Sequence, residues 1–270
     1  RRSGLQEHEL VLTATHTHSA PGGFSDYVLY ALSCGGFDPA ILELYTAATV
    51  ASIQEALSNL QPAEMRMSEG EFDPSVPVAF NRSISAYNQN PGVIKRKRSE
   101  RNLAVNRNMI LLRFDSPDGK PIAMWNWFGV HGTCIHSDYD VVHPDNKGTA
   151  ATFFERDMAA KGHANFLAAF AQGTAGDISP NFKRYFLKKN KRGASPNDVE
   201  SCNINADLQY KHALALFDQA LTTKTLSSRV DSVIEYNDMS KVTVKSSPWG
   251  NDLKTAPAII GIPQIRGTSE

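Results

Sequence analysis

The stretch Leu10-Val11-Leu12-Thr13-Ala14-Thr15-His16-Thr17-His18, followed at once by Ser19-Ala20-Pro21-Gly22-Gly23, decides how this chain is interpreted. Apolar and β-branched residues dominate positions 10–14 and the run stops at a Pro-Gly-Gly turn, which predicts a short buried β-strand. Side chains two positions apart on a strand share a face, so His16 and His18 should project together where this strand meets its loop. Imidazole is the commonest protein ligand for zinc, so the pair indicates a metal site or, more plainly, two surface histidines at a strand end.

The composition is that of an ordinary globular protein. The chain has 270 residues, of which 41% are hydrophobic and 21% charged, and its 28 basic residues balance its 28 acidic ones. This balance gives no indication of a nucleic-acid partner. No apolar run approaches the ~20 residues that a membrane-spanning helix needs, and no signal-peptide core follows the first residues. The three cysteines, Cys34, Cys134 and Cys202, are widely spaced and allow one disulfide at most.

Helical and strand patterns alternate along the rest of the sequence. Asp38-Pro39 is typical of a helix start, and this helix should end near Gln61-Pro62. Further helices are expected at 148–160 and 203–221, and strands at 10–14, 63–72, 78–83, 109–114, 122–130, 166–170, 229–236 and 240–246. The turn Ser116-Pro117-Asp118-Gly119 predicts a hairpin between 109–114 and 122–130. The pattern predicts an α/β domain (α+β is the alternative) with a mixed sheet covered by helices. Because the tail at 261–267 stops in a loop and the first strand begins so early, we expect residues 1–270 to be part of a larger domain.

A third histidine follows another predicted strand. His131 lies in Trp127-Phe128-Gly129-Val130-His131-Gly132-Thr133, at the end of an apolar run. Zinc held by ligands from different strands of one sheet is a common catalytic arrangement, although a single strand-end histidine is more often structural. His136 and His143 follow, and they either extend a metal cluster or are solvated. Asp145 and Asn146 are expected to cap the next helix.

Two polar segments and one basic run complete the candidate set. A tight polar loop is expected at Ala175-Gly176-Asp177-Ile178-Ser179-Pro180-Asn181. This loop either directs Ser179 toward a site or is only a capped turn. It lacks the Gly-x-Ser-x-Gly pattern of α/β-hydrolases. In Asn81-Arg82-Ser83, Arg82 can bind a carboxylate or carbonyl oxygen of a substrate, or form an internal ion pair. The run Lys95-Arg96-Lys97-Arg98 with Arg101 is interpreted as a solvated surface loop, with a membrane-steering patch as the alternative.

Taken in this order, these segments resemble the neutral/alkaline, non-lysosomal ceramidase family of zinc-dependent amidases. The resemblance rests on Thr-His-Thr-His-Ser-Ala-Pro-Gly-Gly from Thr15, Asn-Arg-Ser from Asn81 with Asn-Pro at Asn90, and Trp-Phe-Gly-Val-His from Trp127. It also includes Asp-Asn at Asp145 and Gly-Asp-Ile-Ser-Pro-Asn from Gly176. It covers residues 5–245 and implies that the chain is the N-terminal part of a catalytic domain.

The resemblance also implies a role for each matched residue. His16 and His131 match two zinc-ligand histidines, whereas His18 and Arg82 match residues that contact substrate. Ser179 matches a serine that serves as nucleophile or as a positioning residue. The family completes its zinc shell with a glutamate and a tyrosine from further along the chain, neither of which can be placed here, so this chain alone is expected to be inactive.

The implied reaction is zinc-dependent hydrolysis of the N-acyl amide of ceramide to sphingosine and a fatty acid, with Zn²⁺ as cofactor. The implied partner is ceramide or a related sphingolipid at a membrane surface, in a secreted, periplasmic or cell-surface location. Three alternatives stay open: a zinc hydrolase of another lipid amide or ester, a non-catalytic lipid-binding relative, and a serine hydrolase that uses Ser179.

Overall fold

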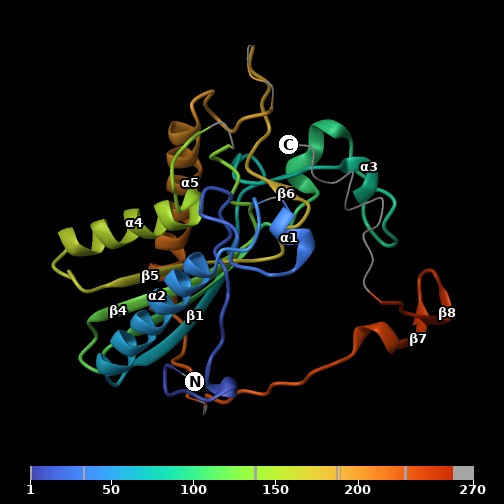
Figure 1. Ribbon diagram of the computed structural model, residues 1–270. Coiled ribbons are helices and arrows are strands. Elements are labelled where there is room, and N and C mark those ends of the chain that lie inside the picture. Colours follow the sequence, from blue (N-terminus) through green and yellow to red (C-terminus); the bar gives the residue numbers. More distant parts are fainter. Residues whose placement is uncertain are drawn as a thin grey trace.

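The centre of the molecule is a four-stranded mixed sheet (Figure 1). The computed structural model describes residues 2–32, 34–136, 139–186, 188, 190–227 and 230–257. The strands follow the spatial order β1-β3-β4-β5, with bounds β1 (Glu64–Glu71), β3 (Asn108–Asp115), β4 (Pro121–Phe128) and β5 (Leu167–Gln172). β3 pairs antiparallel with β1 and β4, whereas β4 pairs parallel with β5. The predicted mixed sheet and the hairpin between its second and third strands are confirmed.

Two helices bury one face of this sheet. α4 (Asp145–Ala160) connects the parallel strands β4 and β5 and packs on β5. α5 (Asp198–Ala220) packs on α4 and on strands β1 and β3. The core between them is aromatic: the Phe154 ring lies 5.4 Å from the rings of both Phe166 and Phe217. Both helices were predicted from apolar spacing, but each begins several residues earlier than expected.

A third long helix, α2 (Pro39–Ser58), begins where the sequence predicts. The Asp38 carboxylate accepts a hydrogen bond from Ala40 N at 2.8 Å, and Pro39 occupies the first helical position, where no backbone donor is needed. The helix ends at Ser58, slightly before the predicted proline boundary.

Short elements arrange the segments around the sheet. β2 (Phe80–Asn81) and β6 (Ile178–Ser179) form a small antiparallel pair, and β2 agrees with the strand predicted at 78–83. The remaining short helices are η1 (Glu7–Glu9), α1 (Val28–Leu32), α3 (Ile84–Tyr87), η2 (Arg98–Leu103) and η3 (Met239–Lys241). Within the described ranges, no helix combines the length and apolar character that crossing a membrane requires.

The buried strand predicted at residues 10–14 is wrong. This segment is extended but belongs to none of the described sheets, and the side chains of Val11 and Leu12 are 72% and 75% exposed. An apolar run becomes a strand only where a neighbouring strand supplies its hydrogen bonds, and the local pattern cannot report whether such a partner exists.

The strand pair predicted near the end is only partly correct. Residues 230–236 form no strand, and Val233 is 92% exposed. β7 (Thr243–Ser247) overlaps the second predicted strand, but its partner is the following segment, β8 (Gly250–Lys254), which was not predicted. The predicted loop at 261–267 lies outside the described residues.

Candidate metal centre

Three histidine side chains from two distant parts of the chain meet at one point. His16 Nε2 lies 2.9 Å from His18 Nε2 and 2.9 Å from His131 Nε2. The ring centroids are 4.5 to 5.2 Å apart, and the rings meet edge to face. The structure therefore brings together His16, His18 and His131, three of the five histidines that the sequence singled out, with their ring nitrogens close to one another.

His16 and His18 converge for a reason other than the predicted strand geometry. His16 has a φ of 65°, in the left-handed region that non-glycine residues rarely adopt. The chain turns there, and the His18 N–H donates to Gly132 O at 3.2 Å, next to His131. A Cβ atom added to Gly132 would lie 1.8 Å from His16 O, so only glycine permits this approach of the two loops.

Polar side chains tie these loops to the sheet. Gln172, the last residue of β5, accepts from Val130 N at 2.9 Å and donates to Val130 O at 2.7 Å and to Thr15 O at 3.2 Å. On the other side, Thr17 Oγ1 donates to His143 O at 2.7 Å and His143 N donates to Ser19 O at 2.8 Å. The histidine-bearing loops are thus held by one strand end and by the segment before α4.

The environment favours neutral imidazoles with lone pairs that face the centre. His131 Nδ1 lies 2.9 Å from the Ala175 carbonyl oxygen, which requires Nδ1 to carry the proton and leaves Nε2 as an acceptor. Burial is the main cause that lowers the pKa of His131 to about 4, with further lowering by the charges of Arg82, His16 and His18. Burial and the Arg82 charge also lower the pKa of His16.

This donor set fits a zinc ion. Zinc is held by neutral imidazole nitrogens in many catalytic sites, where three protein ligands leave a position for water or substrate. A second group of potential ligands, Cys134, Asp145 and Cys202, is completely buried. The Asp145 carboxylate in that group already accepts backbone hydrogen bonds from Cys134 N and Ile135 N, so it is committed to holding the loop that follows His131.

Arg82 is directed to the same region by the β2–β6 pair. Arg82 N donates to Asp177 O at 2.8 Å, and Asn81 Nδ2 donates to the Asp177 carboxylate at 2.8 Å. Because the Arg82 charge lowers the pKa of both His16 and His131, its guanidinium lies within electrostatic reach of the histidine cluster.

Ser179 is buried within the β2–β6 pair and does not reach the surface. The residue is 1% exposed, it pairs with Phe80 in the β2–β6 ladder, and its Oγ accepts a hydrogen bond from Asn181 N at 2.9 Å. Asn181 Nδ2 in turn donates to Thr133 O at 2.7 Å. The Ser179 loop is therefore connected to the His131 loop through Asn181.

Residues at the start of α4 support the site in ways that the sequence analysis missed. Asp145 is the first residue of α4 and not its N-cap, but its carboxylate accepts from Asn146 N in the first turn at 2.7 Å and also from the amides of Cys134 and Ile135. Asn146 Nδ2 donates to His131 O at 2.9 Å, and the fully buried Lys147 donates from Nζ to Phe128 O at 2.6 Å. The signal in the sequence was the unbroken polar run 145–147 next to the helix predicted at 148–160.

The other two loop histidines do not join the cluster. His136 is buried, with Nδ1 3.2 Å from the Asp198 carboxylate and its backbone N–H donating to the same carboxylate. Asp198 also pairs with Arg192 at 2.7 Å. His143 Nδ1 accepts from Asp145 N at 3.0 Å. The prediction that these histidines either extend the cluster or are solvated is therefore wrong for His136.

Fold and site together define a mixed α/β protein with a cluster of three histidines, which could hold a metal ion, on loops at one end of its sheet. The chain belongs to the neutral/alkaline non-lysosomal ceramidase family, because the family model described as "Neutral/alkaline non-lysosomal ceramidase, N-terminal" matches residues 3–270.

Individual relatives agree with this assignment. The chain is 31% identical to a neutral ceramidase of Mycobacterium tuberculosis, and the alignment covers 98% of this chain and 40% of the relative. It is 30% identical to a neutral ceramidase of Pseudomonas aeruginosa, and that alignment covers 98% of this chain and 37% of the relative. The crystal structure of the Pseudomonas aeruginosa protein superposes with a TM-score of 0.74 at 31% identity, over 87% of this chain and 35% of that one. A structure described as "Ceramidase complexed with C2" gives a TM-score of 0.70 at 32% sequence identity, and the superposition covers 82% of this chain and 32% of that chain. The chain thus spans between about a third and two fifths of the length of these relatives.

Proposed function

We propose that this chain contributes to a zinc-dependent amidase that hydrolyses the N-acyl amide of ceramide to sphingosine and a fatty acid. The observation that carries the proposal is the convergence of the three Nε2 atoms of His16, His18 and His131. His16 Nε2 lies 2.9 Å from each of the other two. The relatives named as neutral ceramidases support the choice of ceramide among the possible amides.

His16 and His131 are the residues that would hold the zinc ion. Bound zinc supplies a Lewis acid and lowers the pKa of a coordinated water toward ~7. The His131 Nδ1–H bond to Ala175 O fixes the ring orientation that this role requires. A glutamate and a tyrosine, which the family resemblance adds to the shell, would complete the site.

His18 and Arg82 are assigned to the substrate. His18 belongs to the cluster and is exposed, so its ring is accessible to a substrate hydroxyl or an attacking water. Arg82 carries a permanent positive charge and suits the amide carbonyl oxygen as charge develops on it. We assign Ser179 a positioning role, because a buried hydroxyl that accepts a hydrogen bond from a turn amide is poorly placed to attack.

The test combines metal content with hydrolysis. Zinc is measured by mass spectrometry, and fatty-acid release from a short-chain ceramide is followed in this chain and in any longer form of the protein. His16→Ala and His131→Ala should each lose zinc, whereas His8→Ala, an exposed histidine outside the cluster, should keep it. Zinc well below one per chain in a longer form that also supplies the glutamate and the tyrosine, or unchanged activity when either cluster variant is made in that form, would refute the proposal.

The same experiment separates the alternatives. A panel of acyl amides and esters distinguishes ceramide from other lipid substrates, and ceramide binding that survives chelation without fatty-acid release would identify a lipid-binding relative. Covalent labelling of Ser179 by a fluorophosphonate in metal-free protein would identify a serine hydrolase. The proposal places the reaction at a membrane surface outside the cytoplasm, which follows from the lipid substrate and the family resemblance.

A further inference from the structure

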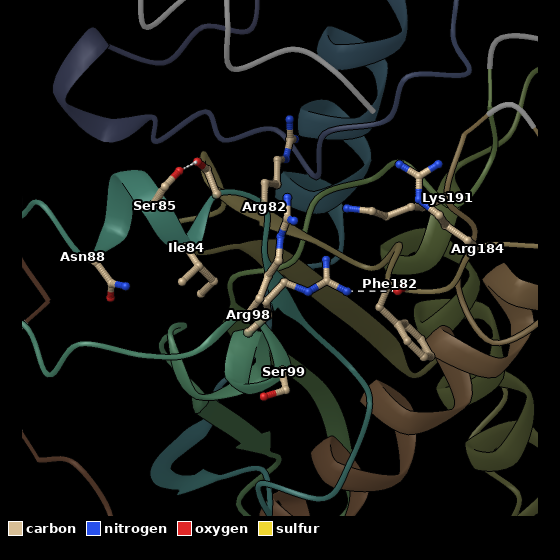
Figure 2. Close-up of a pocket in the computed structure, with 11 residues that line it drawn as sticks. Arg82, Ile84, Ser85, Asn88, Arg98, Ser99, Phe182, Arg184 and Lys191 are labelled. Carbon is tan, nitrogen blue, oxygen red and sulfur yellow. Dashed lines mark hydrogen bonds between the residues drawn. The ribbon is translucent and has the colours of Figure 1, made fainter.

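Two basic segments of the chain, residues 92–99 and 182–192, contribute to the lining of one cavity of about 850 Å³ (Figure 2). The first segment contains four basic residues and the second contains six, and neither contains an aspartate or a glutamate. Figure 2 shows side chains of both segments around the cavity, Arg98 from the first and Phe182, Arg184 and Lys191 from the second. Folding therefore places two stretches with a strong excess of positive charge next to each other.

Contacts at the base of the two segments fix them as neighbours. The Phe182 ring stacks on the Phe80 ring of β2 with centroids 4.3 Å apart, and Arg101 of η2 donates from Nη2 to Phe182 O at 2.9 Å. The second segment is closed by a pair of backbone hydrogen bonds between Lys183 and Arg192, both 2.9 Å long. It is thus a loop with paired ends that is anchored beside η2.

The side chain of Asn88 holds the first segment in the same way. Asn88 Nδ2 donates to Arg96 O at 2.9 Å, and Asn88 Oδ1 accepts from Arg96 N at 2.8 Å. The run that the sequence predicts as a solvated surface loop is exposed at Lys95 and Lys97, but Arg98 begins η2. The exposed cations of this segment therefore stand on an ordered backbone.

Six basic side chains of the two segments are exposed. In the described part of the chain, none of these six forms an ion pair with a carboxylate. They are Lys95, Lys97, Arg98, Lys183, Arg184 and Lys188. This arrangement attracts a surface with many negative charges, and the attraction must weaken as salt is added.

Each segment also exposes one large apolar side chain among its cations. Ile94 is 69% exposed and precedes Lys95, and Phe186 is 95% exposed and lies two residues from both Arg184 and Lys188. A single exposed apolar residue is common on any protein surface. Exposed apolar side chains flanked by lysine and arginine, however, are typical of segments that bind at the interface of an anionic lipid bilayer. A soluble polyanion would use the charges alone, so the two apolar side chains favour a bilayer.

Backbone contacts connect this region to the candidate metal centre. Arg82, which lines the cavity, donates from its backbone N to Asp177 O at 2.8 Å. Two residues earlier in the same loop, Ala175 O lies 2.9 Å from His131 Nδ1. The loop 175–177 therefore contacts both the wall of the cavity and a predicted zinc ligand.

We propose that segments 92–99 and 182–192 form a docking surface for a bilayer that contains anionic phospholipids. The lysines and arginines contact the headgroups, while Ile94 and Phe186 enter the boundary between headgroups and acyl chains. The supply of a lipid substrate from that bilayer rests on the proposed function, whereas binding to the bilayer does not.

The test is co-sedimentation of the protein with vesicles of phosphatidylcholine, with and without phosphatidylserine. We expect binding to the anionic vesicles only, and a loss of binding as the salt concentration rises. Lys95→Glu/Lys97→Glu and Lys183→Glu/Lys188→Glu should each weaken binding at least ~25-fold, because each lysine near the surface contributes about fivefold. Phe186→Ala should weaken it about tenfold, because the ring no longer leaves water.

Two control variants lie outside both segments. Lys224→Glu/Lys254→Glu makes the same change in net charge at two exposed lysines, and Trp249→Ala removes a side chain that is 72% exposed. Each control should bind anionic vesicles within about twofold of the unmodified protein. Circular dichroism verifies that all variants are folded.

Four results would overturn the inference. They are equal binding to neutral and anionic vesicles, equal losses in the segment and control variants, binding that Phe186→Ala leaves unchanged, and binding of the soluble polyanion heparin without binding of vesicles.

Zinc content and hydrolysis of a water-soluble, short-chain ceramide, measured on a longer form of the protein, keep the two proposals apart. Absent vesicle binding in a protein that holds zinc and hydrolyses this substrate refutes the docking surface alone. Vesicle binding without zinc or hydrolysis refutes the proposed function alone.

Discussion

Replacement of Gly132 by alanine tests whether the histidine cluster depends on the close approach of two loops. The added Cβ would lie 1.8 Å from His16 O and 2.9 Å from His16 C, both backbone atoms that no rotamer change can move. Ordinary contact begins at about 3.5 Å, so the two loops must separate by roughly 1.5 Å.

That separation is large compared with the cluster itself. His16 Nε2 now lies 2.9 Å from the ring nitrogens on both sides, and metal–ligand distances tolerate deviations of only about 0.2 Å. The hydrogen bond from His18 N to Gly132 O, 3.2 Å long, would also break. We expect zinc affinity to fall at least ~100-fold, the upper end of what loss of a supporting contact costs.

The fold should survive, because the displaced segment lies outside the core. Residues 10–17 are exposed or half-buried and belong to no sheet, so the unfolding temperature should change little. Gly176→Ala is the matched control: this glycine lies on another loop of the site, but no atom lies within 4 Å of the position where its Cβ would be.

The assay is competitive zinc titration against a chromophoric chelator, combined with circular dichroism to verify folding. Gly132→Ala should lose zinc affinity while Gly176→Ala retains it. Equal zinc affinity in both variants would show that His16 does not need its observed position, and the structural reasoning about the two loops would be refuted.

Three further predictions concern the support of the site and the core. Gln172→Ala removes the side chain that contacts both Val130 and Thr15, so zinc affinity measured by the same titration should fall about tenfold while circular dichroism stays unchanged. Burial lowers the pKa of Lys147 to about 7 from its ordinary value of 10.5. Between these two values the unfolded chain binds more protons than the folded chain, so the free energy of unfolding measured in urea should rise from pH 7 to pH 10. Lys147→Met should abolish that rise. Phe154→Ala removes a fully buried ring that contacts the rings of α5 and β5, and the free energy of unfolding should fall by about 3–5 kcal/mol.

The elements that the sequence predicted correctly are those with local causes. The start of α2 depends on Asp38 and Pro39 alone, and the β3–β4 hairpin on a four-residue turn between two apolar runs. The strand predicted at 10–14 failed because its formation depends on a partner strand far away in sequence. The same reason explains why β7 pairs with β8 and not with residues 230–236.

In the candidate site, too, the sequence predicted the features with local causes and missed the contacts between distant segments. Histidines at the ends of apolar runs identify His16, His18 and His131 as candidates, but the turn that joins the first two depends on Gly132, more than a hundred residues away. No spacing rule could place Asp145 under the amides of Cys134 and Ile135, since that contact follows from how α4 packs.

The cavity lined by five basic side chains (Figure 2) shows that composition does not report how charges are arranged in space. The chain as a whole has no formal net charge, and the charges at 82, 98, 101, 184 and 191 are scattered along the sequence. Folding gathers them around one cavity, and one of them, Arg82, also acts on the histidine cluster. The Arg82 charge also lowers the pKa of His16 and His131, so it favours neutral imidazoles in the histidine cluster. The position that Asp177 and β2 give to Arg82 therefore bears on the protonation state of the candidate metal ligands.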